Sequence, residues 1–200
     1  KALGRLGQID EAATILLALV REPLENDSED SEKVKAVEAL GELDQFEDLR
    51  SLALDSNVST RIRGVAAGAL GRLGRVEAAA EAWIALARSG DKPVGRTIVP
   101  WWGLAQLGRA DDLRTLANDN HVRVSVRIEC AVVLGKLGES DEAADILLTI
   151  ALDNGEYALL EPYDAIRALG ELNRTRDLLL LLHDETLDES RRLNAIDALG

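Results

Sequence analysis

Few side chains in this sequence are of types that could perform catalytic chemistry. The chain of 200 residues has one cysteine, Cys130, and two histidines, His121 and His183. The histidines fall at different positions of the repeat described below, so they do not form a repeated site. The sequence has no His-Glu-x-x-His, Cys-x-x-Cys or Gly-x-Ser-x-Gly pattern. These observations predict a protein that is not an enzyme and that needs neither cofactor nor metal.

The composition is acidic and favours helices. Lys and Arg number 23 against 36 Asp and Glu, which gives a formal net charge of -13, and only 3% of the residues are aromatic. Strands are enriched in aromatic and β-branched residues, so this composition disfavours a β-sheet. Nucleic-acid phosphates and anionic membranes require a cationic surface, and we therefore expect neither as a partner. A single cysteine cannot form an internal disulfide and suits the reducing cytoplasm, where we place the protein.

One short motif recurs along the whole chain. Ala-Leu-Gly-x-Leu or a close variant occurs at residues 2–6, 39–43, 69–73, 103–107, 133–137 and 168–172. The third residue of the motif marks each repeat, and the markers are Gly4, Gly41, Gly71, Ala105, Gly135, Gly170 and Gly200. The intervals between markers alternate between 30 residues and 34 to 37 residues. The repeats are therefore alternately long and short.

Each repeat has the pattern of two helices joined by a turn. The motif ends a helix, because the residue after its last Leu tolerates a left-handed backbone. These residues are Gly7, Asp44, Gly74, Gly108, Gly138 and Asn173. Acidic pairs such as Asp10-Glu11 and Asp141-Glu142 then begin the next helix. The sequence predicts an all-α chain of about six helical hairpins in one array over residues 1–200. The expected repeats are about 5–41, 42–71, 72–105, 106–135, 136–170 and 171–200.

The whole chain resembles a HEAT-repeat solenoid of the short bacterial kind seen in phycobilin-lyase-like proteins. The motif and an Asp-to-Arg spacing carry the resemblance; the pairs are Asp55/Arg63, Asp119/Arg127 and Asp184/Arg192. The resemblance implies a right-handed α-solenoid with the second helix of each repeat on its concave side. It also implies a structural Asp/Arg ladder along the inter-helix turns. The long repeats have Lys33, Thr97 and Pro162 at the Arg position, so we expect the ladder to be interrupted there.

The second helices carry a stripe that we expect to lie at the surface. Trp102 shares its repeat position with Glu38, Gly68, Val132, Arg167 and Asp197, a mixture typical of solvent contact. Trp83, Trp101 and Cys130 instead share positions with small or aliphatic residues, which places them in the core. An exposed Trp beside Val and Arg is typical of a binding hot spot. The predicted partner-binding residues are Arg61, Val65, Arg72, Val99, Trp102, Val132 and Lys136. The alternative is that Trp102 only covers a helix distorted by Pro100.

The loops of the long repeats are a second candidate surface. They are expected at Leu24–Glu32, Ser89–Arg96 and Asp153–Glu161. The first loop is acidic but lacks the order of a calcium-binding loop. Whether these loops are functional stays open.

We expect a non-enzymatic scaffold, or the sensor array of a larger protein, that binds a protein or peptide. Three alternatives remain: a chromophore-lyase or chaperone-like role, a purely structural spacer, and a DNA-glycosylase-like role that the low Lys and Arg content disfavours. The chain begins and ends at the same repeat position. Because a free array needs polar capping repeats, we expect flanking domains of the same parent chain.

Overall fold

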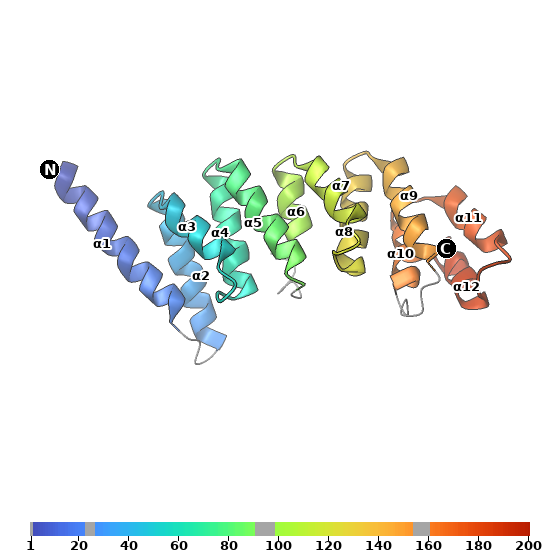
Figure 1. Ribbon diagram of the computed structural model, residues 1–200, viewed down its shortest axis with the longest axis horizontal. Helices are drawn as coiled ribbons and strands as arrows, with labels where there is room; N and C mark the ends of the chain where they lie inside the picture. Colours follow the sequence, from blue (N-terminus) through green and yellow to red (C-terminus); the bar gives the residue numbers. More distant parts are fainter. Residues whose placement is uncertain (1, 23–26, 91–98, 154–160) are drawn as a thin grey trace. The chain divides into compact units, whose positions relative to one another are not determined.

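The structure is a computed structural model that describes residues 2–22, 27–90, 99–153 and 161–200. All regular structure among these residues is helical, which confirms the predicted all-α class (Figure 1). The helices are α1 (Ala2–Arg21), α2 (Asp27–Glu42), α3 (Phe46–Leu54), α4 (Thr60–Arg72), α5 (Val76–Arg88), α6 (Pro100–Gln106), α7 (Ala110–Asn118), α8 (Val124–Lys136), α9 (Ser140–Ala151), α10 (Glu161–Glu171), α11 (Thr175–His183) and α12 (Glu189–Asp197). None of these helices is both long enough and apolar enough to cross a membrane.

The chain forms two compact units, an N-terminal unit of Lys1–Leu107 and a C-terminal unit of Gly108–Gly200. In the N-terminal unit α1 packs on α2, α3 on α4 and α5 on α6, and α4 also contacts α2 and α5. In the C-terminal unit α7 packs on α8, α9 on α10 and α11 on α12, while α10 also contacts α8 and α12 (Figure 1). Each unit is thus a stack of three helix pairs. One array through both units stays a prediction.

Five of the six predicted helix ends are confirmed. The residues that end them have positive φ angles: Asp44 (54°), Gly74 (71°), Gly108 (70°), Gly138 (108°) and Asn173 (55°). The prediction is wrong at Gly7, because α1 continues through Gly7 and through the expected helix start at Asp10-Glu11. The other five turns return the chain along a preceding helix. A helical Gly costs only about 1 kcal/mol, so a helix can continue through it.

The expected acidic loop is partly helical. Helix α2 already begins at Asp27, so the second half of Leu24–Glu32 is not a loop. Acidic residues near a helix start are stabilised by the positive end of the helix dipole, which explains the earlier beginning. Residues 24–26, 91–96 and 154–160 of the three expected loops lie outside the described residues.

Marker glycines let the following repeat approach closely. A Cβ atom at Gly135 would lie 2.6 Å from Cδ1 of Leu172, which directly follows α10, the second helix of the next pair. At Gly71 the corresponding neighbour is Leu107, and its Cδ2 would be 3.4 Å away. The contact with the neighbouring leucine therefore requires glycine at position 135 but not at position 71.

Asp and Arg residues of the short repeats hold the turn between the two helices. The Oδ1 atom of Asp55 accepts a hydrogen bond from the backbone N–H of Asn57 (2.9 Å), and this bond lowers the pKa of Asp55. Arg63 is buried, and its Nε donates to the carbonyl oxygen of Ala53 (3.3 Å) near the end of α3. The second short repeat matches, since Arg127 Nε donates to the carbonyl oxygen of Ala117 (2.9 Å).

The pattern changes in two other repeats. In the last repeat the buried arginine is Arg191 rather than Arg192, and its Nη1 donates to the carbonyl oxygen of Ala151 (3.2 Å). In the first long repeat Lys33 is buried and its Nζ donates to the carbonyl oxygen of Glu22. The predicted interruption is therefore wrong at Lys33, because an ammonium group can satisfy a helix-end carbonyl as a guanidinium does.

Candidate functional site

The three tryptophans have the environments that their repeat positions predict. Trp83 and Trp101 are buried, at 6% and 7% exposure, whereas Trp102 is 42% exposed. Pro100 is the first residue of α6, where its missing N–H removes no helical hydrogen bond. A distorted helix at Pro100 therefore does not explain why Trp102 is exposed.

The indole of Trp83 connects the two helices that carry the predicted binding residues of the N-terminal unit. A Cβ atom at Gly103 in α6 would clash with the ring of Trp83. On α4, a Cβ atom at Gly68 would lie 3.9 Å from Cζ2 of the same ring. The ring of Trp83 therefore contacts both helices. Trp102 directly precedes Gly103, the glycine against which this ring packs.

The other predicted residues of this unit lie on α4 and at the start of α6. Val65 and Arg61 on α4 are half-buried, and so is Val99, the N-cap residue of α6. Arg72 is exposed in the last turn of α4, and its Nη1 lies 3.7 Å from the position of a Cβ atom at Gly68. Its guanidinium thus lies over the glycine that shares the repeat position of Trp102. We call Arg61, Val65, Arg72, Val99 and Trp102 the Trp102 surface.

The two remaining predicted residues belong to the C-terminal unit. Lys136 is exposed in the last turn of α8. Val132 is only 5% exposed, so its predicted place at the surface is wrong. Helix α8 packs against α7, α9 and α10 and is apolar at four consecutive positions, 131–134, all of which are buried. Four consecutive residues make a full helical turn, so this part of α8 is covered on every side.

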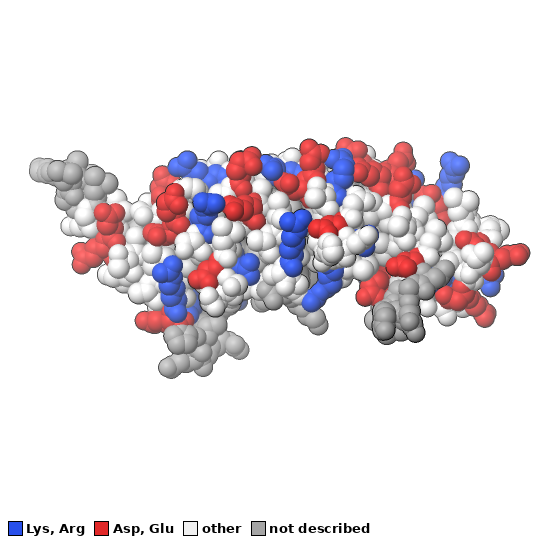
Figure 2. Space-filling model, in the orientation of Figure 1, with Lys and Arg blue, Asp and Glu red and all other residues white. Residues whose placement is uncertain are grey.

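The C-terminal unit has carboxylates where the Trp102 surface has valines. Glu129 and Asp164 occupy the repeat position of Val65 and Val99. Partial burial raises the pKa of Glu129, and the nearby charge of Glu171 raises it further. Asp164 is paired with Arg167, whose Nη2 lies 2.8 Å from Oδ1. Acidic and basic side chains are also interspersed on the face drawn in Figure 2.

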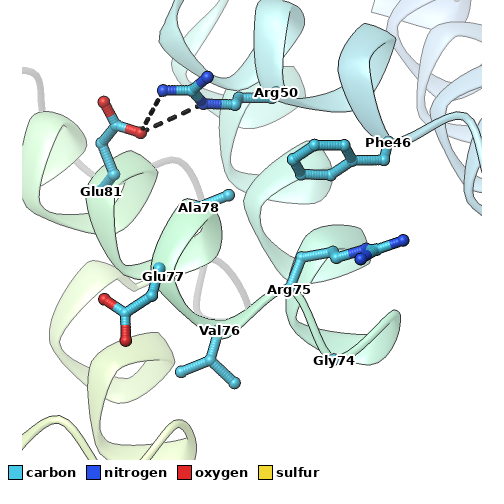
Figure 3. A pocket seen from close by; sticks show the side chains of 8 residues that line it. All are labelled: Phe46, Arg50, Gly74, Arg75, Val76, Glu77, Ala78 and Glu81. Carbon is cyan, nitrogen blue, oxygen red and sulfur yellow. Dashed lines mark hydrogen bonds and ion pairs between the residues drawn. The ribbon is translucent and has the colours of Figure 1, made fainter.

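The sequence analysis missed a hollow of about 450 Å³ between α3 and α5 (Figure 3). The Cζ atom of Arg75 lies 5.1 Å from the ring centroid of Phe46, a cation–π contact. Nη2 of Arg50 lies 3.0 Å from Oε2 of Glu81. Both arginines therefore already have partners within the hollow, and Val76 at its rim is 37% exposed. Two repeats contribute these residues, so no pattern within one repeat identifies the site; the only signal is that Phe46 is the single Phe.

The cysteine is enclosed in the core, and the two histidines contact local backbone or turn residues. Cys130 is fully buried, and this burial raises the pKa of its thiol to about 12. Asp119 Oδ1 accepts from the backbone N–H of His121 (3.0 Å), and His183 Nδ1 lies 2.7 Å from the carbonyl oxygen of Leu179. In the part of the chain that the structure describes, no three His, Cys, Asp or Glu side chains group as metal ligands would.

Comparisons with known proteins give no family. No protein-family model and no curated protein sequence matches the chain. Among solved structures, the chain is similar to a crystal structure of an engineered protein from the Northeast Structural Genomics Consortium. The two are 16% identical, the match covers 94% of this chain and 87% of the other, and the TM-score is 0.39. A similarity of this size assigns neither a family nor a function.

Proposed function

We propose that the protein is a non-enzymatic scaffold, a HEAT-like α-solenoid that binds a partner peptide at the Trp102 surface. The observation that carries the proposal is the exposure of Trp102, at 42%, beside two tryptophans that are buried. A large aromatic side chain that the fold does not need for its core is a typical anchor for a partner.

The charges around Trp102 indicate which peptides would bind. Arg61 and Arg72 give the surface a positive character, whereas the whole chain has a net charge of -13. Val65, Val99 and Trp102 offer apolar contact between them. The surface therefore suits an acidic peptide that also has a bulky apolar side chain, since complementary charge steers association and excludes other partners.

A random-peptide display library tests this proposal. We expect the wild-type chain to enrich peptides in which Asp or Glu flanks Leu, Phe or Trp. Trp102→Ala should weaken binding of a selected peptide at least tenfold, because hot-spot truncations cost about 2 kcal/mol or more. Its melting temperature should change little, since the side chain is partly exposed.

The matched control is Val76→Ala, an exposed apolar residue at the hollow of Figure 3. This variant should bind the selected peptides as the wild type does. If Val76→Ala abolishes binding and Trp102→Ala does not, the hollow is the binding site and the Trp102 surface is not. If Trp102→Ala unfolds the protein, Arg72→Glu provides the second test, because it reverses an exposed charge of the same surface.

A further inference from the structure

Two arginines that follow a helix-ending turn are each paired with the aspartate three residues later. Nε of Arg109 lies 2.6 Å from Oδ2 of Asp112. Nε of Arg174 lies 2.6 Å from Oδ2 of Asp177. Each arginine is the N-cap residue of its helix, α7 or α11. In both repeats, the arginine at this position therefore binds a carboxylate of its own helix.

Arg75 has the same repeat position before α5, but its repeat lacks the aspartate. The residue three positions later is Ala78. On the preceding first helix, Phe46 has the repeat position of Ser140, whose Oγ lies 3.4 Å from Nη1 of Arg174. Among the described residues no carboxylate is paired with Arg75, and its Cζ lies 5.1 Å from the ring centroid of Phe46. Two polar partners of the arginine are thus replaced by apolar side chains.

The hollow of Figure 3 lies at these replaced positions. Phe46, Arg75 and Ala78 all line it, and Val76 adds a further apolar side chain at the rim. Its volume of about 450 Å³ is within the range of about 300–1,000 Å³ that is usual for small-molecule sites. The hollow therefore combines the size of such a site with an apolar wall and a guanidinium group.

The charges that line the hollow favour one anionic group. Nη2 of Arg50 lies 3.0 Å from Oε2 of Glu81, so these two charges already compensate each other. Figure 3 shows the carboxylate of Glu77 pointing away from the guanidinium of Arg75. The N–H donors of a guanidinium form a planar fork that fits a carboxylate, and a cation–π contact does not use them. Arg75 is therefore the lining residue that can bind an anion.

We propose that this hollow binds a small aromatic carboxylate. The carboxylate lies beside Arg75 as the side chains of Asp112 and Asp177 lie beside their own arginines. The aromatic body packs on Phe46 and Val76. An anion without such a body makes only one exposed charge contact, which contributes little, whereas an aromatic body also buries apolar surface. The site is separate from the Trp102 surface and does not depend on it.

Nitrogen-15 NMR titrations with phenylacetate, phenylacetamide and acetate test the proposal. Phenylacetate should shift the backbone amides of residues 74–78 and approach saturation. Phenylacetamide has the same ring without the charge and should bind about fivefold more weakly, the factor expected for one exposed charge contact. Acetate has the charge without the ring and should not approach saturation over the same concentrations.

Two variants separate the roles of the arginine and of the missing aspartate. Arg75→Gln should reduce the affinity for phenylacetate to that for phenylacetamide. Ala78→Asp restores the carboxylate of the other repeats, so it should compete for Arg75 and abolish the binding of phenylacetate. Its melting temperature should not fall, because an acidic residue in the first turn of a helix is favourable. Arg174→Gln is the matched control: it makes the same change at the same repeat position outside the hollow and should leave binding unchanged.

Three results would overturn the proposal. The first is equal affinity for phenylacetate and phenylacetamide, which would mean that Arg75 does not bind the carboxylate. The second is an Ala78→Asp variant that still binds phenylacetate at residues 74–78. The third is a set of shifts confined to the Trp102 surface, which would place the anion at Arg61 or Arg72 and leave the proposed peptide site intact. If Arg75→Gln unfolds, Ala78→Asp alone decides.

Discussion

Burial controls the chemistry of the single thiol. The side chain of Cys130 is fully buried in α8, and burial together with the charge of Glu129 raises the pKa of the thiol to about 12. Only the thiolate attacks a disulfide reagent, and at mildly alkaline pH roughly one thiol in ten thousand would be ionised. We expect Ellman's reagent to label the native protein orders of magnitude more slowly than the protein in denaturing guanidinium. Equal rates would mean that the thiol is accessible; Cys130→Ala gives the background.

Arg63 satisfies a backbone carbonyl that no helical N–H can reach. Its Nε donates to the carbonyl oxygen of Ala53, and the side chain is only 5% exposed. Arg63→Met keeps most of the apolar stem but leaves the carbonyl without this donor, so we expect a loss of about 1.5–3 kcal/mol in the free energy of unfolding. Urea denaturation measures it. Arg72→Met, on the exposed part of the same helix, should cost less than about 0.5 kcal/mol. Similar losses for both variants would contradict this role.

At the scale of the helices, Gly103 and Trp83 form a complementary pair. The other long repeats have Leu16 and Leu147 at the position of Trp83, and every other repeat has Ala or Val at the position of Gly103. The indole is larger than Leu, and α6 makes room for it by having no side chain where the ring contacts the helix.

Two Gly→Ala substitutions separate this packing from helix propensity. Gly103→Ala places a methyl group against the buried ring of Trp83, which cannot bend away, so we expect a loss of about 1–3 kcal/mol. Gly71→Ala meets its nearest neighbour outside the helix at 3.4 Å and should be neutral, or stabilising by up to about 1 kcal/mol. Thermal and urea denaturation of both variants measure the difference. If the Gly103→Ala variant were as stable as the Gly71→Ala variant, the packing of the Trp83 ring would not require a glycine at position 103.

The sequence predicts helices and their ends well where the signal is local. Asp44 and Asn173 end helices because their short polar side chains tolerate a positive φ. The prediction failed where the outcome depends on a neighbour. Gly7 has the right type to end a helix, yet α1 continues through it. Val132 shares its repeat position with exposed residues, yet it lies in a helix that contacts three others, α7, α9 and α10.

At the scale of the whole molecule, the repeat position of a residue predicts its exposure only where the same neighbouring helices pack around it. Ile196 and Ile166 occupy the same repeat position and are the same residue type, yet one is 48% exposed and the other is fully buried. The exposure of a side chain therefore depends on the helices that pack around it and not only on its residue type and repeat position. Alignment of the repeats predicted the buried Trp101 and the exposed Trp102, but it predicts the same exposure for Ile166 and Ile196, which differ.

The net charge of the whole chain predicts its response to salt. With a net charge of -13, carboxylates repel one another across the surface, and salt near 0.15 M shortens the screening length to about 8 Å. Exposed ion pairs such as Arg50–Glu81 are worth at most about 1 kcal/mol each, so we expect salt to weaken repulsion more than attraction. The melting temperature should rise by a few degrees from low salt to about 0.15 M in differential scanning calorimetry.

Two variants that break the same ion pair decide whether net charge is the cause. Arg50→Gln makes the net charge more negative by one unit, whereas Glu81→Gln makes it less negative by one unit. If repulsion dominates, salt should raise the melting temperature more for Arg50→Gln than for Glu81→Gln. If this ion pair dominates instead, the wild type should lose stability in salt and both variants should respond alike, because each has lost the attraction between Arg50 and Glu81.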